Sequence, residues 1–280
     1  MLNNPILLDK IITNALEEDL GLGDITTDSI IGGDIIGKAV LETREDIILA
    51  GLPVFMRVFL ILDPDISFET YYKDGQKVSG GEVICSINGA MASILKAERT
   101  ALNLIQRMSG IATLTSEYVS RAASDKVKIL DTRKTIPGLR LLDKYAVSIG
   151  GGHNHRFGLF DGILIKDNHI AVAGSIKYAV EAARKNAPHG IKVEVEVENM
   201  EGVKIAIEAR ADIILLDNMP PERMKEAVDF VAGRTLLEAS GGITLDNIKE
   251  VAATGVDMIS IGALTHSVKA VDLSLEISRL

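Results

Sequence analysis

The second half of the chain, from about residue 123 onward, alternates short apolar runs with longer segments in which apolar residues recur every three or four positions. Short runs rich in Ile, Leu and Val are typical of buried strands, and the three-to-four spacing predicts amphipathic helices. The predicted strands cover residues 127–131, 162–166, 193–197, 212–217, 235–240 and 258–262. The predicted helices between them cover residues 139–148, 175–186, 200–210, 221–231 and 245–253.

Strands that alternate with helices at this length favour right-handed β-α-β units, and hence a parallel sheet with helices outside it. Six such units follow one another without an obvious reversal, which suits a barrel better than a doubly wound sheet. The fold class is therefore predicted to be α/β, with an atypical (β/α) barrel of six or seven parallel strands in this half.

The first half has a mixed α+β pattern. Residues 5–19 and 52–62 have helical spacing, and residues 37–50 have an extended pattern. The glycine-rich segment 73–89 contains turn dipeptides such as Asp74-Gly75, which favour tight hairpins. A long helical stretch from Ser93 to about Ala123 connects this half to the predicted barrel.

Composition and charge exclude several classes of protein. A hydrophobic fraction of 47% over 280 residues is ample for a buried core, and the net charge of -9 repels polyanions such as nucleic acids. The first 20 residues contain four acidic side chains and no unbroken apolar run, which argues against a signal peptide. No apolar stretch is long enough to cross a bilayer, so a globular cytoplasmic protein is expected.

The single cysteine, Cys85, lies in a strand-like sequence and has no partner for an internal disulfide. We expect a buried structural thiol in a reducing compartment rather than a nucleophile.

Polar or glycine residues follow nearly every predicted strand of the second half. In α/β barrels the reactive groups lie at the carboxyl ends of the strands, where the loops gather around one opening. A single polar residue after a strand usually marks only where the chain meets water. The agreement of six strands is what predicts a site. These strand ends are residues 131–135, 166–169, 196, 217–218, 240–242 and 262–263.

Cations are concentrated among these strand ends. Arg133, Lys134 and Lys166 follow strands, and the glycine-rich loop 150–156 adds His155 and Arg156. An acidic protein that gathers positive charge at one opening is suited to a small, multiply charged anion, since Arg pairs with planar carboxylates and Lys supplies a point charge. The alternative for any single cation is a solvated surface side chain.

The remaining strand ends suggest sites for metal and phosphate. Glu196 and Asp217 could hold Mg²⁺ or ribose hydroxyls, directly or indirectly, although a structural ion pair is the alternative. The glycines after Ser240, together with Gly262 and Ala263, are at the loops where this architecture usually binds phosphate. A Gly-Gly turn by itself is more often only a tight loop.

Nucleophilic and zinc chemistry are not indicated. No Ser-His-Asp or Cys-His arrangement stands out, and the histidines lack the spacing of a zinc site. We therefore expect catalysis by positioning and electrostatics. The five histidines are His153, His155, His169, His189 and His266.

The chain resembles the decarboxylating nicotinate-nucleotide pyrophosphorylases, also called quinolinate phosphoribosyltransferases. The resemblance spans the full length and rests on an ordered series of motifs rich in functional groups. These motifs occupy residues 18–27, 98–103, 109–113, 131–140 (DTRKTIPGLR), 144–146, 154–156, 165–169 (IKDNH), 194–196, 215–218, 238–243 and 262–267 (GALTHS).

This resemblance implies two domains and a shared site. An N-terminal α/β sandwich would comprise residues 1–112 and the C-terminal segment 267–280, and the barrel would comprise residues 113–266. The resemblance also implies a homodimer or higher homo-oligomer in which Arg99 reaches the active site of the neighbouring subunit.

The resemblance also implies a role for each candidate residue. Arg133, Arg156, Lys134 and Lys166, with Thr132 and His155 beside them, would hold the two carboxylates of quinolinate. Glu196 and Asp217 would contact ribose and Mg²⁺. The implied phosphate cradle comprises Ser240, Gly241, Gly242, Gly262 and Ala263, and the implied catalytic residues are Lys134, Lys166, Glu196 and Asp217.

The implied activity joins quinolinate to phosphoribosyl pyrophosphate and releases pyrophosphate and carbon dioxide. Three alternatives share part of the pattern. One is a related phosphoribosyltransferase-like protein linked to molybdenum transport, and another is a barrel aldolase that forms a Schiff base on Lys134 or Lys166. The third is a non-catalytic binding protein, which the many charged strand ends disfavour.

Overall fold

The computed structural model describes residue 2, residues 4–31 and residues 35–279. The chain divides into two compact units, which are described separately. The first comprises Met1–Ser116, Thr135–Gly151 and Leu264–Leu280, and the second comprises Glu117–Lys134 and Gly152–Ala263. The predicted domain limits at residues 112 and 267 stay a prediction.

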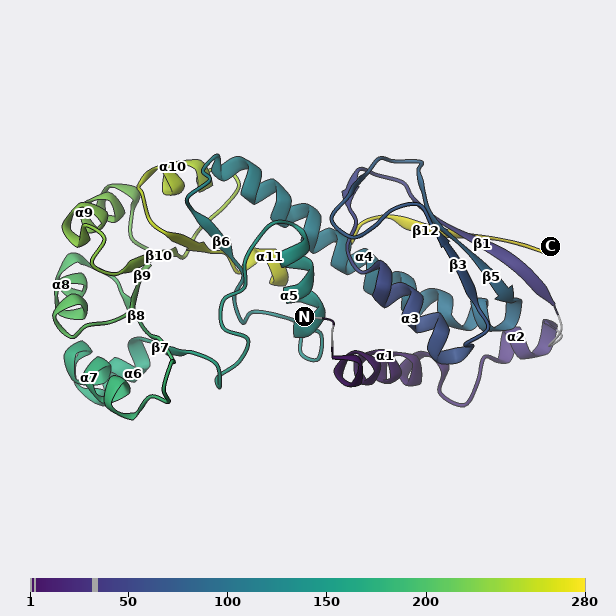
Figure 1. Ribbon diagram of the computed structural model, residues 1–280, viewed down its shortest axis with the longest axis horizontal. Helices are drawn as coiled ribbons and strands as arrows, with labels where there is room; N and C mark the ends of the chain where they lie inside the picture. The colour runs from purple at the N-terminus through teal and green to yellow at the C-terminus, as the bar shows by residue number, and fades with distance from the viewer. Residues whose placement is uncertain (1, 3, 32–34, 280) are drawn as a thin grey trace. The chain divides into compact units, whose positions relative to one another are not determined.

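The first unit is built on a four-stranded antiparallel sheet in the order β12-β1-β5-β3 (Figure 1). The strands are β1 (Ile36–Thr43), β3 (Ser67–Thr70), β5 (Val83–Ala90) and β12 (Leu273–Arg279). Alternate residues of β1 are buried, as expected when only one face of a sheet meets the core. Cys85 on β5 is buried as predicted, and burial raises the pKa of its thiol to about 12, which keeps the thiol protonated and unreactive.

Helices cover this sheet. They are α1 (Pro5–Leu20), α2 (Ile25–Ile30), α3 (Leu52–Leu62) and the first part of α4 (Met91–Ala122). Phe59 of α3 packs edge-on against Phe68 of β3, with ring centroids 5.9 Å apart. The predicted turn at Asp74-Gly75 orients a carboxylate that accepts hydrogen bonds from the first amides of α3. A two-stranded ribbon of β2 (Ile47–Ile48) and β4 (Lys77–Val78) lies beside this turn.

The second unit contains the predicted parallel sheet. Six strands lie in the order β6-β11-β10-β9-β8-β7, and every ladder between them is parallel. The strands are β6 (Lys128–Leu130), β7 (Ile163–Ile165), β8 (Val193–Val197), β9 (Ile213–Asp217), β10 (Leu236–Ser240) and β11 (Met258–Ser260). Each falls within a predicted apolar run, so the prediction of the fold class is confirmed.

The helices between the strands lie on the outer side of the curved sheet (Figure 1). They are α7 (Ile176–Asn186), α8 (Met200–Glu208), α9 (Pro221–Val231) and α10 (Ile248–Ala253). The short helix α6 (Asp167–Ala173) precedes them, while α5 (Arg140–Ile149) belongs to the first unit. The last helix, α11 (Ala263–His266), begins at the end of the second unit.

Strands β6 and β7 are the two edges of the sheet. Leu130 of β6 forms an isolated parallel bridge to His153, so the chain after residue 152 runs beside β6 without forming a full strand. This bridge brings residues 153–156 to the carboxyl end of the sheet. Among the helices of the described residues, none combines the length and apolar character that a bilayer crossing requires.

Candidate active site

The strand register places the predicted polar residues on one face of the sheet. Glu196 of β8 is opposite Leu215 of β9, and Ser240 of β10 is opposite both Asp217 and Ser260. Residues in register point to the same face, and so do residues two positions apart on a strand. Glu196, Asp217 and Ser240 therefore share the inner face at the carboxyl end of the sheet.

Lys166 joins this group from the end of β7. Its Nζ lies 3.0 Å from Oε2 of Glu196, and the Lys166 side chain is 48% exposed while that of Glu196 is 15% exposed. The backbone of Lys166 is held at the start of α6, where its amide donates to Nδ1 of His169 at 2.9 Å. The ion pair therefore lies at the opening rather than in the core.

A buried aspartate positions the cationic loop. Asp131, which is fully buried, accepts from Nδ2 of Asn154 at 2.6 Å and from the amide of His155 at 2.9 Å. Beyond the same strand, the amide of Lys134 donates to Oγ1 of Thr132 at 3.0 Å. Asp131 thus ties residues 154–155 to the end of β6.

Two arginines are close enough to repel each other. Burial, followed by the positive charge of Arg133, lowers the pKa of Arg156. Nη1 of Arg156 donates to the carbonyl of Gly162 at 3.0 Å, but its buried Nε has no hydrogen-bond partner in the described part of the chain. Arg156 therefore offers an N–H group to an anion.

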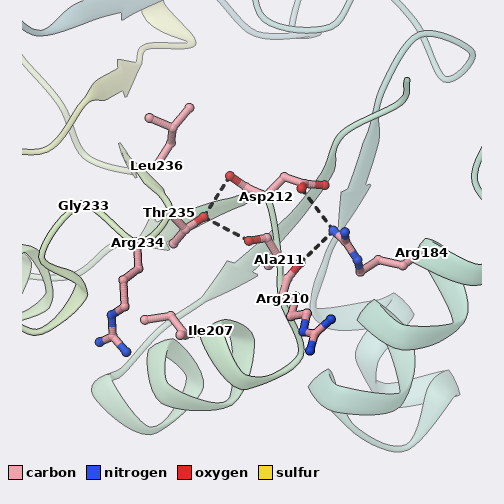
Figure 2. Close-up of a pocket in the computed structure, with 9 residues that line it drawn as sticks. All are labelled: Arg184, Ile207, Arg210, Ala211, Asp212, Gly233, Arg234, Thr235 and Leu236. Atoms are coloured by element: carbon pink, nitrogen blue, oxygen red, sulfur yellow. Dashed lines mark hydrogen bonds and ion pairs between the residues drawn. The ribbon is translucent and has the colours of Figure 1, made fainter. Parts of the chain in front are cut away.

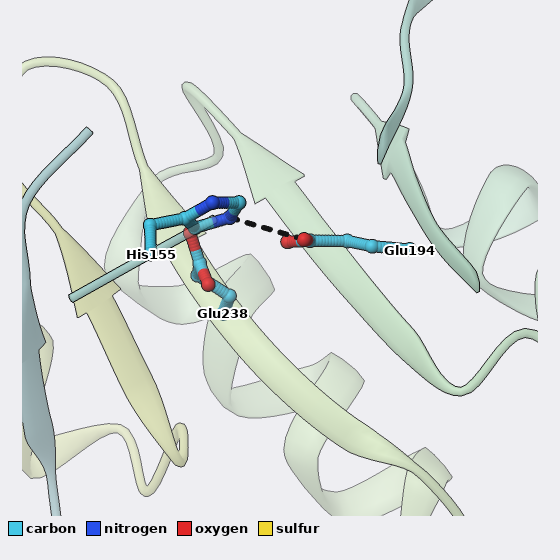
Figure 3. Close-up of side chains that lie close together, drawn as sticks. All are labelled: His155, Glu194 and Glu238. Atoms are coloured by element: carbon cyan, nitrogen blue, oxygen red, sulfur yellow. Dashed lines mark ion pairs between the residues drawn. The ribbon is translucent and has the colours of Figure 1, made fainter. Parts of the chain in front are cut away.

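Below the opening, three side chains point toward one another (Figure 3). Nε2 of His155 lies 3.0 Å from Glu194 of β8 and 3.7 Å from Glu238 of β10. Both glutamates are buried, at 5% and 1% exposure. Burial, together with the charge of Glu194, raises the pKa of Glu238.

The predicted phosphate loop has the backbone that its glycines allow. Gly241 and Gly242 have φ angles of +90° and +62°, and a Cβ on Gly241 would collide with the side-chain amide of Asn218. The backbone amide of Asn218 donates to the backbone carbonyl of Ser240 at 2.9 Å. Gly262 and Ala263 follow β11, and Ala263 begins α11.

Arg99 belongs to the first unit. Its side chain is exposed on α4. The other predicted site residues all belong to the second unit.

A separate pocket lies where β9 and β10 begin, and it is lined by three arginines (Figure 2). Nη1 of Arg184 donates to the carbonyl of Arg210 and to Asp212, while the guanidinium of Arg234 donates to two carbonyls at the end of α9. Two of the three cations thus stabilise helix ends.

The sequence motifs contained residues whose roles were not predicted. Glu194 and Glu238 lie in the quoted motifs but were not named as site residues, and Asn218 was included only as part of the strand end 217–218. A glutamate inside an apolar strand is a signal in itself, since a buried carboxylate needs a partner.

The chain matches two family models along most of its length. The model described as quinolinate phosphoribosyl transferase, N-terminal domain, matches residues 24–109, and the C-terminal domain model matches residues 111–276. The chain belongs to the quinolinate phosphoribosyl transferase family. This membership does not favour the molybdenum-transport, aldolase or non-catalytic alternatives.

Proteins similar to this chain occur in a bacterium and in a plant. The probable nicotinate-nucleotide pyrophosphorylase [carboxylating] of Bacillus subtilis is 46% identical, covering 98% of this chain and 95% of the relative. A quinolinate phosphoribosyltransferase [decarboxylating] of Nicotiana glauca, named as mitochondrial, is 43% identical over 96% of this chain and 82% of its own.

A crystal structure of NadC from Streptococcus pyogenes superposes with a TM-score of 0.95 at 42% identity, covering 99% of this chain and 98% of the other. The nicotinate-nucleotide pyrophosphorylase from Francisella tularensis gives 0.92 at 46% identity, with 97% and 96% covered.

Proposed function

We propose that the protein is a quinolinate phosphoribosyltransferase, a pentosyltransferase of NAD biosynthesis. It would convert quinolinate and phosphoribosyl pyrophosphate into nicotinate mononucleotide, pyrophosphate and carbon dioxide. Full-length similarity to proteins with this name supports the proposal. The structural observation that carries it is the buried Nε of Arg156, which has no partner in the described residues and lies near Arg133.

The basic residues would hold the two carboxylates of quinolinate. Guanidinium groups match planar carboxylates through paired hydrogen bonds, so we assign Arg133 and Arg156 to this role. Lys134 and Lys166 would add positive charge at the opening, with Thr132 and His155 beside them. On binding, the unpaired N–H of Arg156 would gain an acceptor.

Glu196 and Asp217 fit a magnesium ion that substrate helps to bind. They supply carboxylate oxygens from neighbouring strands, and Mg²⁺ usually takes one or two carboxylates together with substrate phosphates and waters. Oε2 of Glu196 already accepts from Lys166, and Oδ2 of Asp217 accepts from Asn218 at 2.9 Å, so both carboxylates are held in place. Bound Mg²⁺ would supply positive charge to the pyrophosphate group.

The protein's own residues would act by positioning. The loop of Ser240, Gly241 and Gly242, with Gly262 and Ala263, would bind the phosphate through backbone amides. The pyridine nitrogen, held in line, would donate its lone pair to C1 of ribose as the C1–O bond breaks and pyrophosphate leaves with the bonding electrons. Lys134 and Lys166 would stabilise the negative charge that develops.

Decarboxylation would follow from the new positive charge on the ring. Loss of carbon dioxide leaves an electron pair at C2, which the adjacent quaternary nitrogen stabilises until C2 takes up a proton. The protein would keep the 3-carboxylate clamped while the 2-carboxylate leaves.

Several further features belong to the same proposal. The protein would act in the cytoplasm as a homodimer or larger homo-oligomer, with Arg99 completing the site of a neighbouring subunit. The N-terminal sandwich would comprise residues 1–112 and 267–280, and the barrel would comprise residues 113–266.

A direct assay tests the proposed function. Purified protein incubated with quinolinate, phosphoribosyl pyrophosphate and Mg²⁺ should produce nicotinate mononucleotide and carbon dioxide in equal amounts. Nicotinate is the control substrate because it lacks the 2-carboxylate, and it should react poorly. Absence of the mononucleotide with quinolinate would rule out this activity.

A further inference from the structure

The proposed reaction leaves two buried glutamates without a role. Oε1 of Glu194 and Oε1 of Glu238 accept no hydrogen bond within the described residues. One oxygen of each glutamate and a ring nitrogen of His155 all lie within 4.8 Å of one another. A group of this kind could bind a metal ion, or it could hold a proton.

The tautomer of His155 distinguishes the two possibilities. The amide of Arg156 donates to Nδ1 of His155 at 2.8 Å, so Nδ1 presents a lone pair and the proton of the neutral ring is on Nε2. Nε2 then donates toward Oε2 of Glu194, 3.0 Å away. A protonated nitrogen cannot bind a metal ion, and a ligating histidine usually donates through its other nitrogen. The group is therefore arranged to hold a proton.

Glu238 is the residue that would hold it. Two ionised carboxylates facing a neutral imidazole in a buried place would repel each other, so one of them is favoured in its neutral form. Glu194 has the imidazole N–H, whereas Oε1 of Glu238 lies 3.7 Å from the same nitrogen.

The groups around Glu238 agree with this assignment. Burial, then the charge of Glu194, raises the pKa of Glu238 to about 7, and Asp131 acts in the same direction. A hydrogen bond with Ser260 acts in the opposite direction, as would the positive charge of His155 if its ring were protonated, and both are weaker influences than burial and Glu194.

Glu194 lies within electrostatic reach of Arg156, and Glu238 lies 3.7 Å from Nε2 of His155, the residue that would lie beside the cations that bind quinolinate. The negative charge of Glu194 raises the pKa of Arg156, and the positive charge of Arg133 lowers it. An ionised Glu238 would cancel part of the positive potential that attracts a dianion. Conversely, a bound dianion would disfavour ionisation of Glu238, because linkage between two sites is reciprocal.

We propose that Glu238 is a positioning residue of the quinolinate pocket that carries a proton whenever the dianion is bound, so that a proton is taken up together with quinolinate. This inference rests on the proposed function. The proton comes from solvent and bonds to a carboxylate oxygen of Glu238, and no bond of the substrate changes.

Calorimetry of quinolinate binding tests the inference. Titrations at about pH 8 in buffers of different ionisation enthalpy should show uptake approaching one proton per quinolinate. The affinity should fall by up to about tenfold per pH unit above about pH 7. Glu238→Gln mimics the neutral acid, so it should take up almost no proton and bind with little pH dependence. Glu181→Gln, an exposed change on α7, should behave like the unaltered protein.

Steady-state kinetics separate this role from a merely structural one. In the unaltered enzyme the KM for quinolinate should rise with pH while the KM for phosphoribosyl pyrophosphate does not follow it. Glu238→Gln should remove the rise in the quinolinate KM. Equal proton uptake by the Gln variant and the unaltered protein would overturn the inference.

Further measurements use only the unaltered protein, so they do not depend on whether a variant folds. Infrared difference spectra of the unaltered protein should show a protonated carboxyl band above pH 7 that grows when quinolinate is added, and its absence would contradict the inference. Tight stoichiometric binding of Zn²⁺ that abolishes this band would favour a metal site instead. If no quinolinate binds at about pH 6.5, where Glu238 is protonated, the proposed function itself fails and the inference falls with it.

Discussion

Arg156 is a half-buried cation whose Nε–H group the fold encloses without an acceptor among the described residues. A buried donor without an acceptor costs about 1–3 kcal/mol, and the charge of Arg133 adds repulsion. The ligand-free protein is therefore less stable than it would be with a neutral side chain here. The same feature gives an incoming carboxylate a strong hydrogen bond, because the donor has no competing partner to leave.

Arg156→Ala is predicted to separate binding from stability. The KM for quinolinate should rise by about 10- to 100-fold, since a hydrogen bond to a charged group contributes about 1.5–3 kcal/mol. The melting temperature should stay the same or rise, because the change removes a half-buried charge that Arg133 repels, which outweighs the lost hydrogen bond from Nη1 to the carbonyl of Gly162. Arg184→Ala, which removes a surface ion pair with Asp212, is the control and should leave the KM unchanged. An unchanged quinolinate KM in Arg156→Ala would contradict the assignment.

The raised pKa of Glu238 predicts that the stability of the protein depends on pH between about 4.5 and 7. Its pKa is raised in the folded protein above the ordinary glutamate value of 4.5, so the folded state binds the proton more tightly than the unfolded state. The stability from this proton is full below about pH 4.5 and is lost as the pH rises through about 7. Denaturant unfolding between these values should show Glu238→Gln losing less stability with rising pH than the unaltered protein. Parallel curves would contradict the assignment of a neutral Glu238.

The proposed phosphate loop depends for its shape on one glycine more than on its neighbour. Gly241 combines a φ of +90° with a position where a Cβ would meet Asn218, whereas a Cβ on Gly242 at φ +62° would enter open space. Strain of this kind costs about 1–3 kcal/mol. The two glycines therefore form a matched pair for testing the loop.

Gly241→Ala is predicted to raise the KM for phosphoribosyl pyrophosphate by on the order of tenfold or more, because a shift of Asn218 and Ser240 would misplace the phosphate donors. Gly242→Ala should raise this KM less. It should lower the stability by about 1 kcal/mol, from its left-handed backbone alone. Steady-state kinetics with quinolinate saturating would measure both. Equal KM values for the two variants would show that the contact with Asn218 does not matter.

Local patterns were enough to predict most elements of the second unit. The alternating sequence of β8 and the apolar runs of β9 and β10 appear in the structure within a residue or two of their predicted limits. Helix α6 was not predicted because its seven residues bury no side chain and so produce no apolar repeat. Strand β12 was not predicted because its partner β1 is more than two hundred residues away in sequence.

The candidate site was predictable to the same extent. The ends of strands identified Lys166, Glu196 and Asp217, because parallel strands bring their carboxyl ends together. Glu238 could not be assigned in this way, since its neighbours Glu194 and His155 come from other segments whose register is not a local property. The proton-holding group therefore emerges only from the folded arrangement.

At the scale of the whole molecule, the first unit is assembled from three separate segments of the chain. Arg107 of α4 joins all three of them. It makes two hydrogen bonds to Asp143 of α5, at 2.9 and 2.8 Å, and donates to the carbonyl of Thr265 at 2.8 Å. Asp143 is fully buried, so this is an ion pair away from water.

Asp143→Asn is predicted to destabilise the protein by about 3–5 kcal/mol, because breaking a buried pair leaves Arg107 without its counter-charge. Asp229→Asn, which removes an exposed pair with Lys225, should cost only about 0–1 kcal/mol. Denaturant unfolding of both variants would measure the difference. Similar midpoints would show that the junction of the three segments does not depend on this ion pair.

If the protein is a homo-oligomer with shared active sites, two inactive variants should complement each other. If Arg99 acts in the site of a neighbouring subunit, Arg99→Ala and Arg133→Ala are each expected to be nearly inactive alone. A mixed dimer would then carry both changes in one site and leave the other site intact. Co-expressing the two variants should restore about a quarter of the unaltered activity, since half of the dimers would be mixed. Recovery should disappear when both changes are placed in the same chain. Activity that stays at the level of the single variants after mixing would instead mean that Arg99 serves the site of its own subunit.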